Sequence, residues 1–297
     1  MRQPIRLCVA PLVAAAALAA CTRSAPDAKT TDSTTAAAPA PAATSNVLTI
    51  TATDYAFDAP AQVPAGFTTI RVQSNGKEPH QAALIRIEQG KTFADFAAAV
   101  KAMAKEPGPP PAWLVDDGGP NPPMPNGTAE SIQYLAPGTY AIVCFVPSPD
   151  GTPHIAKGMM RELTVTPMST AGAVAAPNAD ASITLADYSF TDAAPLGPGH
   201  HVIRVTNNGP QSHEVVLIRL EPGKTGAQFA QWVNGMKGPP PGALLGGVAA
   251  MAPGDTAYFP ADLTPGNYAF VCFVPDSKDG KPHVMHGMVK DFEVKGT

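Results

Sequence analysis

The chain repeats itself, and this internal repeat constrains its fold more than any other feature. The matching segments are Asp54–Phe57 with Asp187–Phe190, Leu84–Glu88 with Leu217–Glu221, and Pro137–Tyr140 with Pro265–Tyr268. The first two pairs lie 133 residues apart and the third pair lies 128 apart, so the second copy has a shorter excursion before its last strands. We therefore expect two copies of one fold. We interpret the Asp-Tyr-x-Phe segments as core or strand-edge residues rather than as part of a site.

Each copy has the pattern of a β-structure with one short helix. Apolar and polar residues alternate over Val47–Ala52 in the manner of a strand. Over Phe93–Met103 the apolar residues instead recur at helical spacing, with Thr92 as a candidate N-cap. In the second copy, Thr225 and Gln228 form a capping box. The 34 prolines, 26 glycines and only 15% charged residues also favour loop-rich β-structure.

Five regions follow from the repeat and from the composition of the segments around it. They are an export signal over 1–20, a disordered tether over 21–45, a first β domain over 46–166, a linker over 167–181, and a second β domain over 182–297. Arg2 and Arg6 give the signal a positive start, and Leu12–Ala20 form its short apolar core. Residues 22–45 contain no aromatic or large apolar residue, so this segment cannot bury enough surface to become ordered.

The export signal ends in Leu18-Ala19-Ala20-Cys21, which resembles the signal of bacterial lipoproteins. The resemblance implies cleavage before Cys21 and acylation of Cys21, so that the mature protein is attached to a membrane by its lipid. We expect a location in the bacterial cell envelope, facing the periplasm or the cell exterior. Because Thr22 rather than Asp follows the cysteine, the outer membrane is favoured if the cell has two. The alternative is an ordinary secretory signal with a cysteine there by chance.

In each copy a cysteine, a histidine and a methionine follow a strand-like run. Tyr140–Met159 reads YAIVCFVPSPDGTPHIAKGM, and Tyr268–Met288 reads YAFVCFVPDSKDGKPHVMHGM. With an earlier histidine from each copy, the candidate metal ligands are His80, Cys144, His154 and Met159, and then His213, Cys272, His283 and Met288. Thiolate, imidazole and thioether together suit copper. Each residue alone is more often structural than functional, and duplicated domains inherit structural residues too, but the joint recurrence of the set predicts a metal site.

This order of ligands resembles the cupredoxin family of blue copper proteins, such as plastocyanin, azurin and rusticyanin. In that family the first histidine comes from an early strand region, the cysteine ends the penultimate strand, and the following loop supplies the second histidine and the methionine. The resemblance implies an all-β chain of two tandem cupredoxin-like Greek-key β-sandwiches, each with one short helix insertion. It also implies at most one type 1 copper per domain, held in a plane by two histidines and a cysteine, with a weak axial methionine.

The loop between the cysteine and the second histidine is longer here than is usual in that family. The inserts span Pro147–Pro153 and Pro275–Pro282, and each contains an Asp-Gly pair, which favours a turn. Each insert can therefore fold outward as a hairpin and return the histidine to the cysteine.

The resemblance implies single-electron transfer and no catalysis. Copper oxidases and nitrite reductases need further histidine clusters, including a histidine beside the cysteine, whereas Val143 and Phe145 flank Cys144. The alternatives are copper storage or delivery, and a metal-free binding module at the cell surface, with the inserts and proline-rich excursions as its recognition surface. A disulfide between Cys144 and Cys272 is a further alternative. We expect a redox partner protein, or a copper donor or acceptor, and no nucleic acid, since the formal charge is −4 and no basic stripe is present.

Overall fold

Two β-sheets face each other in the first half of the chain. Its strands are β1 (Asn46–Thr53), β2 (Ala56–Asp58), β3 (Gln62–Pro64), β4 (Gly66–Ser74), β5 (Ala83–Ile87), β6 (Leu114–Asp116), β7 (Thr128–Leu135), β8 (Gly138–Val143) and β9 (Met160–Thr166). One sheet has the order β2-β1-β4-β7 and the other has the order β3-β9-β8-β5-β6. Strands β1 and β4 run parallel, with Leu48 opposite Ile70, and both side chains are buried between the sheets.

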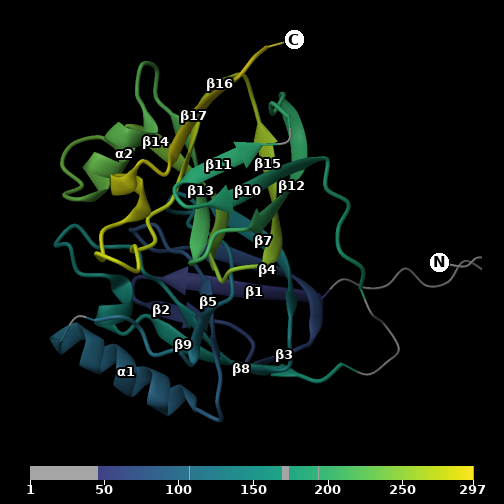
Figure 1. Ribbon diagram of the computed structural model, residues 1–297, viewed down its shortest axis with the longest axis vertical. Helices are drawn as coiled ribbons and strands as arrows, with labels where there is room; N and C mark the ends of the chain where they lie inside the picture. The colour runs from purple at the N-terminus through teal and green to yellow at the C-terminus, as the bar shows by residue number, and fades with distance from the viewer. Residues whose placement is uncertain (1–45, 107, 169–173, 193, 297) are drawn as a thin grey trace, which may run out of the picture. The chain divides into compact units, whose positions relative to one another are not determined.

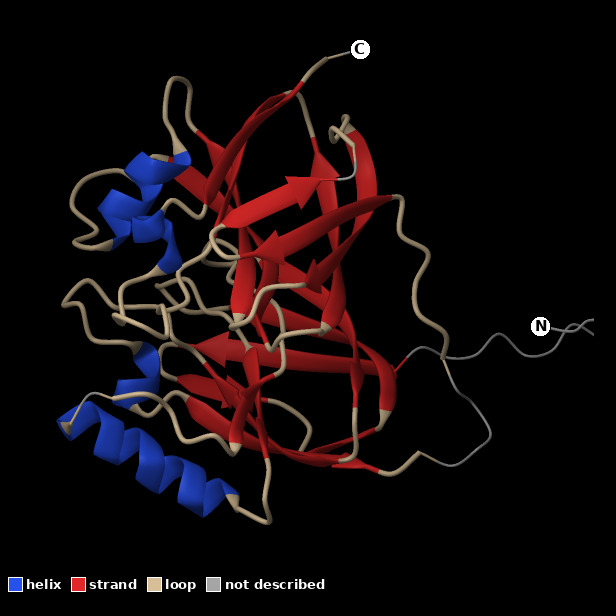
Figure 2. Cartoon of the chain, in the orientation of Figure 1, coloured by secondary structure: helices blue, strands red, loops and turns tan. Residues whose placement is uncertain are grey.

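The second half repeats this arrangement. Its strands are β10 (Ala181–Ala186), β11 (Ser189–Asp192), β12 (Gly199–Asn207), β13 (His213–Leu220), β14 (Gly242–Met251), β15 (Thr256–Leu263), β16 (Gly266–Val271) and β17 (Val289–Val294). One sheet has the order β11-β10-β12-β15 and the other has the order β14-β13-β16-β17. Strands β10 and β12 again run parallel, which matches β1 and β4. The predicted fold class is therefore confirmed: the chain is mostly β, with two cupredoxin-like β-sandwiches (Figure 2).

One short helix lies against the outside of each sandwich. Helix α1 (Phe93–Lys105) begins at Thr92 and α2 (Gly226–Val233) begins at Thr225, and both have a capping box that satisfies the first backbone N–H groups. Buried Phe96 of α1 packs on the outer face of β5 and β8, and buried Phe229 of α2 packs on the outer face of β13 and β16. Figure 1 shows α1 lying along the strands of the first half.

The strand before each cysteine alternates between two cores. In β8, Tyr140 and Ile142 point into the space between the sheets, while Ala141 and Val143 pack toward α1. Since successive side chains of a strand point to opposite faces, the next residue, Cys144, points back between the sheets. The helix on the outer face thus helps to hold the strand that positions the cysteine.

The two halves meet along hydrogen-bonded backbone. Strands β7 and β15 pair antiparallel, which joins one sheet of each half into a single eight-stranded sheet. The proline-rich excursion of the first half also pairs with β14, through Asp117 with Met251 and Pro120 with Val248. Residues 118–123 are buried there, so this part of the excursion is not the exposed recognition surface considered above.

These descriptions come from a computed structural model that describes residues 46–106, 108–168, 174–192 and 194–296. The predicted signal over 1–20, Cys21 and the tether up to residue 45 lie outside the described residues, and so does part of the predicted linker over 167–181. Export, lipid attachment and the domain boundaries remain predictions. Among the helices in the described ranges, none is long and apolar enough to cross a membrane.

Candidate metal centres

The first half brings two histidines and a cysteine together in its interior. His80 lies just before β5, Cys144 follows β8, and His154 begins a single 3₁₀ turn, η1 (His154–Lys157). The two Nδ1 atoms of the histidines are 3.1 Å apart, and Cys144 Sγ lies 3.3 Å from His154 Nδ1. All three side chains are completely buried. Three donors at about 2 Å from one ion in a plane would be about 3.5 Å apart, so the spacing fits a small metal ion.

The second half contains the same group. His213 begins β13, Cys272 follows β16, and His283 begins the second 3₁₀ turn, η2 (His283–His286). The two Nδ1 atoms are 3.0 Å apart, and Cys272 Sγ lies 3.4 Å from His283 Nδ1. These three residues are also completely buried.

The long inserts fold outward as hairpins, as expected. Pro147 pairs with Pro153, and Pro275 pairs with Pro282. After the first hairpin, the Ile155 N–H donates to the Cys144 carbonyl oxygen at 2.8 Å. The insert therefore adds length without moving the second histidine away from the cysteine.

Each candidate methionine lies in the same apolar core as its cysteine. Met159 is fully buried with Cys144, and Met288 is fully buried with Cys272. The Met159 carbonyl oxygen accepts from the Cys144 N–H at 3.4 Å, which ties the two residues together through the backbone. The role of both methionines as axial ligands remains a prediction.

Hydrogen bonds to the outer nitrogens show that the first centre is built for a cation. His80 Nε2 lies 3.1 Å from an Asp54 carboxylate oxygen, and His154 Nε2 lies 2.7 Å from a Glu78 carboxylate oxygen. Burial opposes ionisation of both acids, but their several hydrogen bonds, with the histidines and with neighbouring groups, together outweigh it and lower the pKa of Asp54 and of Glu78. Since ionised carboxylates only accept, both Nε2 atoms carry a ring proton, and Nδ1 is the nitrogen of each neutral ring that could bind a metal ion. A single cation could be bound by both Nδ1 atoms and the cysteine sulfur.

In the second centre a carboxylate also lies beside each histidine, but only one of the two is within hydrogen-bond distance. His213 Nε2 lies 2.8 Å from Asp187 Oδ1. His283 Nε2 lies 3.7 Å from Asp276 Oδ2, and this buried nitrogen has no hydrogen-bond partner in the described structure. Asp276 instead accepts from the Tyr188 hydroxyl at 2.5 Å, which lowers the pKa of Asp276.

Burial disfavours the charged forms of both cysteines and of three of the four histidines. It raises the pKa of the Cys144 thiol to about 12 and raises that of Cys272 well above the ordinary value. It also lowers the pKa of His80 and His213, and together with the neighbouring His213 it lowers the pKa of His283 to about 4. A metal ion would take neutral imidazoles directly and would displace the thiol proton. Both cysteines are free in the structure, each in its own core, which excludes a disulfide between them.

The Asp-Tyr-x-Phe segments belong partly to the centres, so our interpretation of them as core or strand-edge residues was wrong for two of their positions. Asp54 accepts from His80, and the Tyr55 ring lies edge-on to His154 with ring centroids 5.1 Å apart. Asp187 and Tyr188 do the same in the second half. The phenylalanines are buried in the cores, and the two tyrosines are half-buried and pack against them. Recurrence with the histidines at the same offset of 133 was the signal in the sequence.

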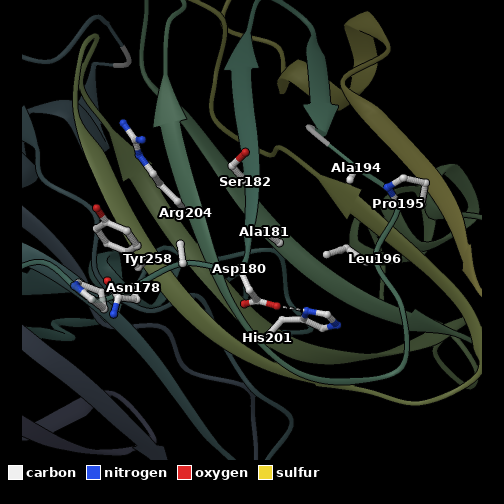
Figure 3. Close-up of a pocket in the computed structure, with 12 residues that line it drawn as sticks. Asn178, Asp180, Ala181, Ser182, Ala194, Pro195, Leu196, His201, Arg204 and Tyr258 are labelled. Carbon is white, nitrogen blue, oxygen red and sulfur yellow. Dashed lines mark hydrogen bonds and ion pairs between the residues drawn. The ribbon is translucent and has the colours of Figure 1, made fainter.

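Other polar groups lie apart from the two centres. His286 contacts Asp279 at 3.2 Å, in an outer group with Asp276 on the loop. A shallow pocket of about 440 Å³ lies beside β10 and β12, where His201 pairs with Asp180 at 2.6 Å (Figure 3). None of the eight candidate ligands lines it.

Each half therefore holds one buried His-Cys-His group with a methionine in the same core, which is the donor set of a type 1 copper site. Copper bound there would be held by the two histidines and the cysteine of each group.

Comparisons with known proteins give matches among solved structures only. No family model matches the chain, and no curated protein matches it. Among solved structures, a dithionite-reduced auracyanin from Roseiflexus castenholzii is 25% identical over 42% of this chain and 100% of that one, with a TM-score of 0.29. Auracyanin A of Chloroflexus aurantiacus, a "blue" copper protein, is 25% identical over 41% and 100%, with a TM-score of 0.28. A blue copper oxidase from Nitrosomonas europaea is 16% identical over 84% and 85%, with a TM-score of 0.23. Because these TM-scores are below 0.5, the function proposed below rests on the geometry of the centres and not on these matches.

Proposed function

We propose that this chain is an exported, lipid-anchored electron carrier that holds one type 1 copper in each half. The observation that supports it best is the convergence of two histidine Nδ1 atoms beside a buried cysteine, present twice. A metal-free binding module would have no reason to bury two such groups of polar metal-binding side chains in its interior.

Rigid ligands favour electron transfer. When bound, copper supplies a one-electron couple, and the protein must hold its donors in the same place in both oxidation states. Here the cysteine follows a strand that is packed on both faces, and carboxylates orient three of the four histidine rings by hydrogen bonds. Little rearrangement would therefore accompany a change of charge.

The same burial argues against catalysis and against copper delivery. A catalytic metal keeps an open position for substrate, and a delivery protein must let the ligands of its acceptor reach the metal. All six histidine and cysteine ligands are completely buried. Val143 and Phe145 flank Cys144, and Val271 and Phe273 flank Cys272, so no histidine next to a cysteine leads to a further copper.

The proposal includes the location and the partner. Acylation at Cys21 and a tether over 22–45 would hold the two sandwiches near a membrane of the bacterial envelope, facing the periplasm or the exterior. A redox protein in the same compartment would exchange electrons with them.

Copper titration tests the function. We expect protein that starts at Thr22 to bind two coppers and to show an intense thiolate-to-copper absorption band. Cys144→Ser and Cys272→Ser should each remove one copper and part of the band, and the double variant should remove both. His200→Gln, at an exposed histidine on β12, is the control and should retain two. Copper uptake without a thiolate band, or uptake unchanged in the double variant, would contradict the proposal.

Fractionation tests the anchor separately. The full chain expressed in a bacterial host should appear in the membrane fraction and carry an acylated Cys21 by mass spectrometry. Cys21→Ala should leave the protein unacylated. An unmodified Cys21 on membrane-free protein would exclude the anchor without affecting the copper centres.

A further inference from the structure

Two equivalent polar residues lie next to the first histidine of each centre. Gln81 follows His80, and Glu214 follows His213, again at an offset of 133. Both side chains point into the protein and are about 6% exposed. Between them lies Asn121 from the proline-rich excursion, which is 1% exposed.

These three side chains form a continuous hydrogen-bonded chain. The Phe145 N–H donates to Gln81 Oε1 at 3.0 Å, and Gln81 Nε2 donates to Asn121 Oδ1 at 3.1 Å. Asn121 Nδ2 donates to Glu214 Oε2 at 3.2 Å. At the far end, the Phe273 N–H donates to Glu214 Oε1 at 2.8 Å.

Each end of this series of hydrogen bonds lies next to a candidate metal ligand, one in each half. Phe145 is the residue after Cys144, and Phe273 is the residue after Cys272. Each terminal N–H is therefore joined through one peptide unit to a cysteine whose sulfur is a candidate ligand. Among the described residues, these four hydrogen bonds form a continuous polar route from one cysteine to the other.

The orientation of the Asn121 amide is fixed by its neighbours. Besides Glu214, its Nδ2 group lies within hydrogen-bond distance of the carbonyl oxygens of Val215 at 3.0 Å and Val248 at 2.9 Å, so its two hydrogens are shared among three acceptors, all in the second half. These bonds fix which end of the Asn121 amide faces Gln81 and which faces Glu214. Burying three polar side chains is costly unless all are bonded, and a fully bonded network in a low dielectric is rigid.

We propose that Gln81, Asn121 and Glu214 form a bridge that couples the two centres and carries one electron between them. This inference rests on the function proposed above. With copper bound in both centres, the transfer would oxidise one Cu(I) to Cu(II) and reduce the other Cu(II) to Cu(I), so the exchange would need no other reactant. An electron tunnels more readily along covalent and hydrogen bonds than across gaps of the same length, and this bridge supplies bonds across the boundary between the halves.

A bridge of this kind makes the two centres one two-electron unit. An electron that enters at either centre reaches both, so a single docking position for a redox partner would serve the whole molecule. Two independent carriers on one chain would need no buried polar contact between the residues that follow their cysteines.

Hydrogen exchange on the metal-free full chain tests the bridge without any redox reaction. We expect slow exchange at the Phe145 and Phe273 amides in the native protein. Asn121→Leu should accelerate exchange at both, although the two amides belong to different halves. Gln133→Leu is the matched control, because Gln133 is a buried amide that bonds to the Asp117 carbonyl oxygen and the Gly119 N–H of the same excursion but lies outside the bridge. Unchanged exchange at either amide in Asn121→Leu would overturn the bridge.

Pulse reduction of the copper-loaded protein tests the electron path. Less than one electron per molecule is delivered to the oxidised protein, and the signals of the two centres are assigned from Cys144→Ser and Cys272→Ser. We expect a redistribution between centres whose rate does not depend on protein concentration. Asn121→Leu, and independently Gln81→Met, should slow it several-fold, while Gln133→Leu should not.

Each failure has its own meaning. A native rate that depends on protein concentration, or equal slowing in the control, would overturn the bridge while leaving two blue centres intact. Absence of bound copper would instead remove the proposed function, and the exchange result at Phe145 and Phe273 would stand apart from it. If Asn121→Leu does not fold, Gln81→Met provides the same comparison, since methionine matches glutamine in length and shape.

Discussion

The two centres place a carboxylate beside the loop histidine from different parts of the chain. In the first half Glu78, just before the first histidine, carries the charge, and Ser148 on the hairpin is neutral. In the second half the positions are exchanged: Gln211 is neutral and Asp276 on the hairpin carries the charge. The pairs sit at the repeat offsets of 133 and 128 residues. In both halves a tyrosine hydroxyl bonds to the carboxylate, at 3.2 Å from Tyr55 and 2.5 Å from Tyr188.

This exchange shows which feature of the loop histidine's surroundings is shared by the two centres and which differs between them. One carboxylate beside the loop histidine is present in both halves, but its origin and geometry differ. His154 Nε2 has a hydrogen bond of 2.7 Å, whereas the closest carboxylate to His283 Nε2 is 3.7 Å away. The charge is therefore common to both halves, and the direct hydrogen bond is found only in the first.

The largest expected effect tests a feature that the halves share. Gly119 and Gly247 have φ of 94° and 115°, and an added Cβ would overlap the carbonyl oxygens of Ala82 and Val215. Gly119→Ala and Gly247→Ala should each lower the free energy of unfolding by roughly 2–5 kcal/mol, measured by denaturant titration. Gly235→Ala, with open space around the new methyl group, should change it little. If only one of the two variants lost stability, the two equivalent glycines would not be under the same steric constraint.

A second prediction tests a difference at this boundary. Burial raises the pKa of Asp117 to about 7, although Arg86 partly offsets it, and the repeat places Leu245 at the equivalent position. Because the folded state holds a proton that the unfolded chain loses near pH 4, this contribution to stability is fully present below about pH 4. It is lost as the pH rises to about 7, by at most about 4 kcal/mol.

Stability curves of native protein and Asp117→Asn between pH 4 and 8 check this sign. The variant should lack the decline, so it should gain stability relative to the native chain as the pH rises. Asp58→Asn, at an exposed position on β2, is the control. Parallel curves for native protein and Asp117→Asn would show that the carboxyl ionises normally in the folded state.

The exchanged carboxylates provide a third prediction, on copper affinity. Glu78→Gln removes a direct bond to a ligand and should weaken the first centre by about 10–100-fold. Asp276→Asn should weaken the second centre less, because its carboxylate does not bond His283 directly. Competition titrations in single-centre proteins measure each value.

Glu130→Gln is the matched control, since Glu130 pairs with Arg71 at 2.6 Å, away from both centres. An equal or larger loss in Asp276→Asn would show that charge alone, without a hydrogen bond, supports the loop histidine.

The smallest expected effect concerns the reduction potentials. Glu214 adds a carboxylate near Cys272 where the first half has the neutral Gln81, and negative charge stabilises the oxidised form. The second centre should therefore have the lower potential. Glu214→Gln should raise it by up to about 60 mV, which corresponds to about 1.4 kcal/mol for one electron.

Voltammetry near pH 8 is suited to this test, since burial raises the pKa of Glu214 to about 7. Glu293→Gln, at an exposed position on β17, should leave both potentials unchanged. A second centre with the higher potential would mean that other groups outweigh Glu214.

The parts of the fold that depend on local pattern could be predicted from the sequence. Alternation predicted the strand over Val47–Ala52, and helical spacing after Thr92 predicted α1, because both patterns record which face of an element is buried. The hairpin form of the inserts also followed from their Asp-Gly turns. The outer carboxylates were not assigned, although Asp54 and Asp187 recur at the same offset as His80 and His213, because a shared offset does not say which residues are in contact.

By itself, the sequence determined that one β-fold occurs twice and that each copy carries a Cys-His-Met loop, because a repeat offset and a strand period are properties of the chain alone. Only the tertiary structure decided how the copies meet and what surrounds each ligand. The burial of the proline-rich excursion against β14, and the placement of Asn121 between Gln81 and Glu214, depend on contacts between residues far apart in the sequence. No local pattern encodes such contacts, since they arise when two separately formed surfaces pack and satisfy each other's polar groups.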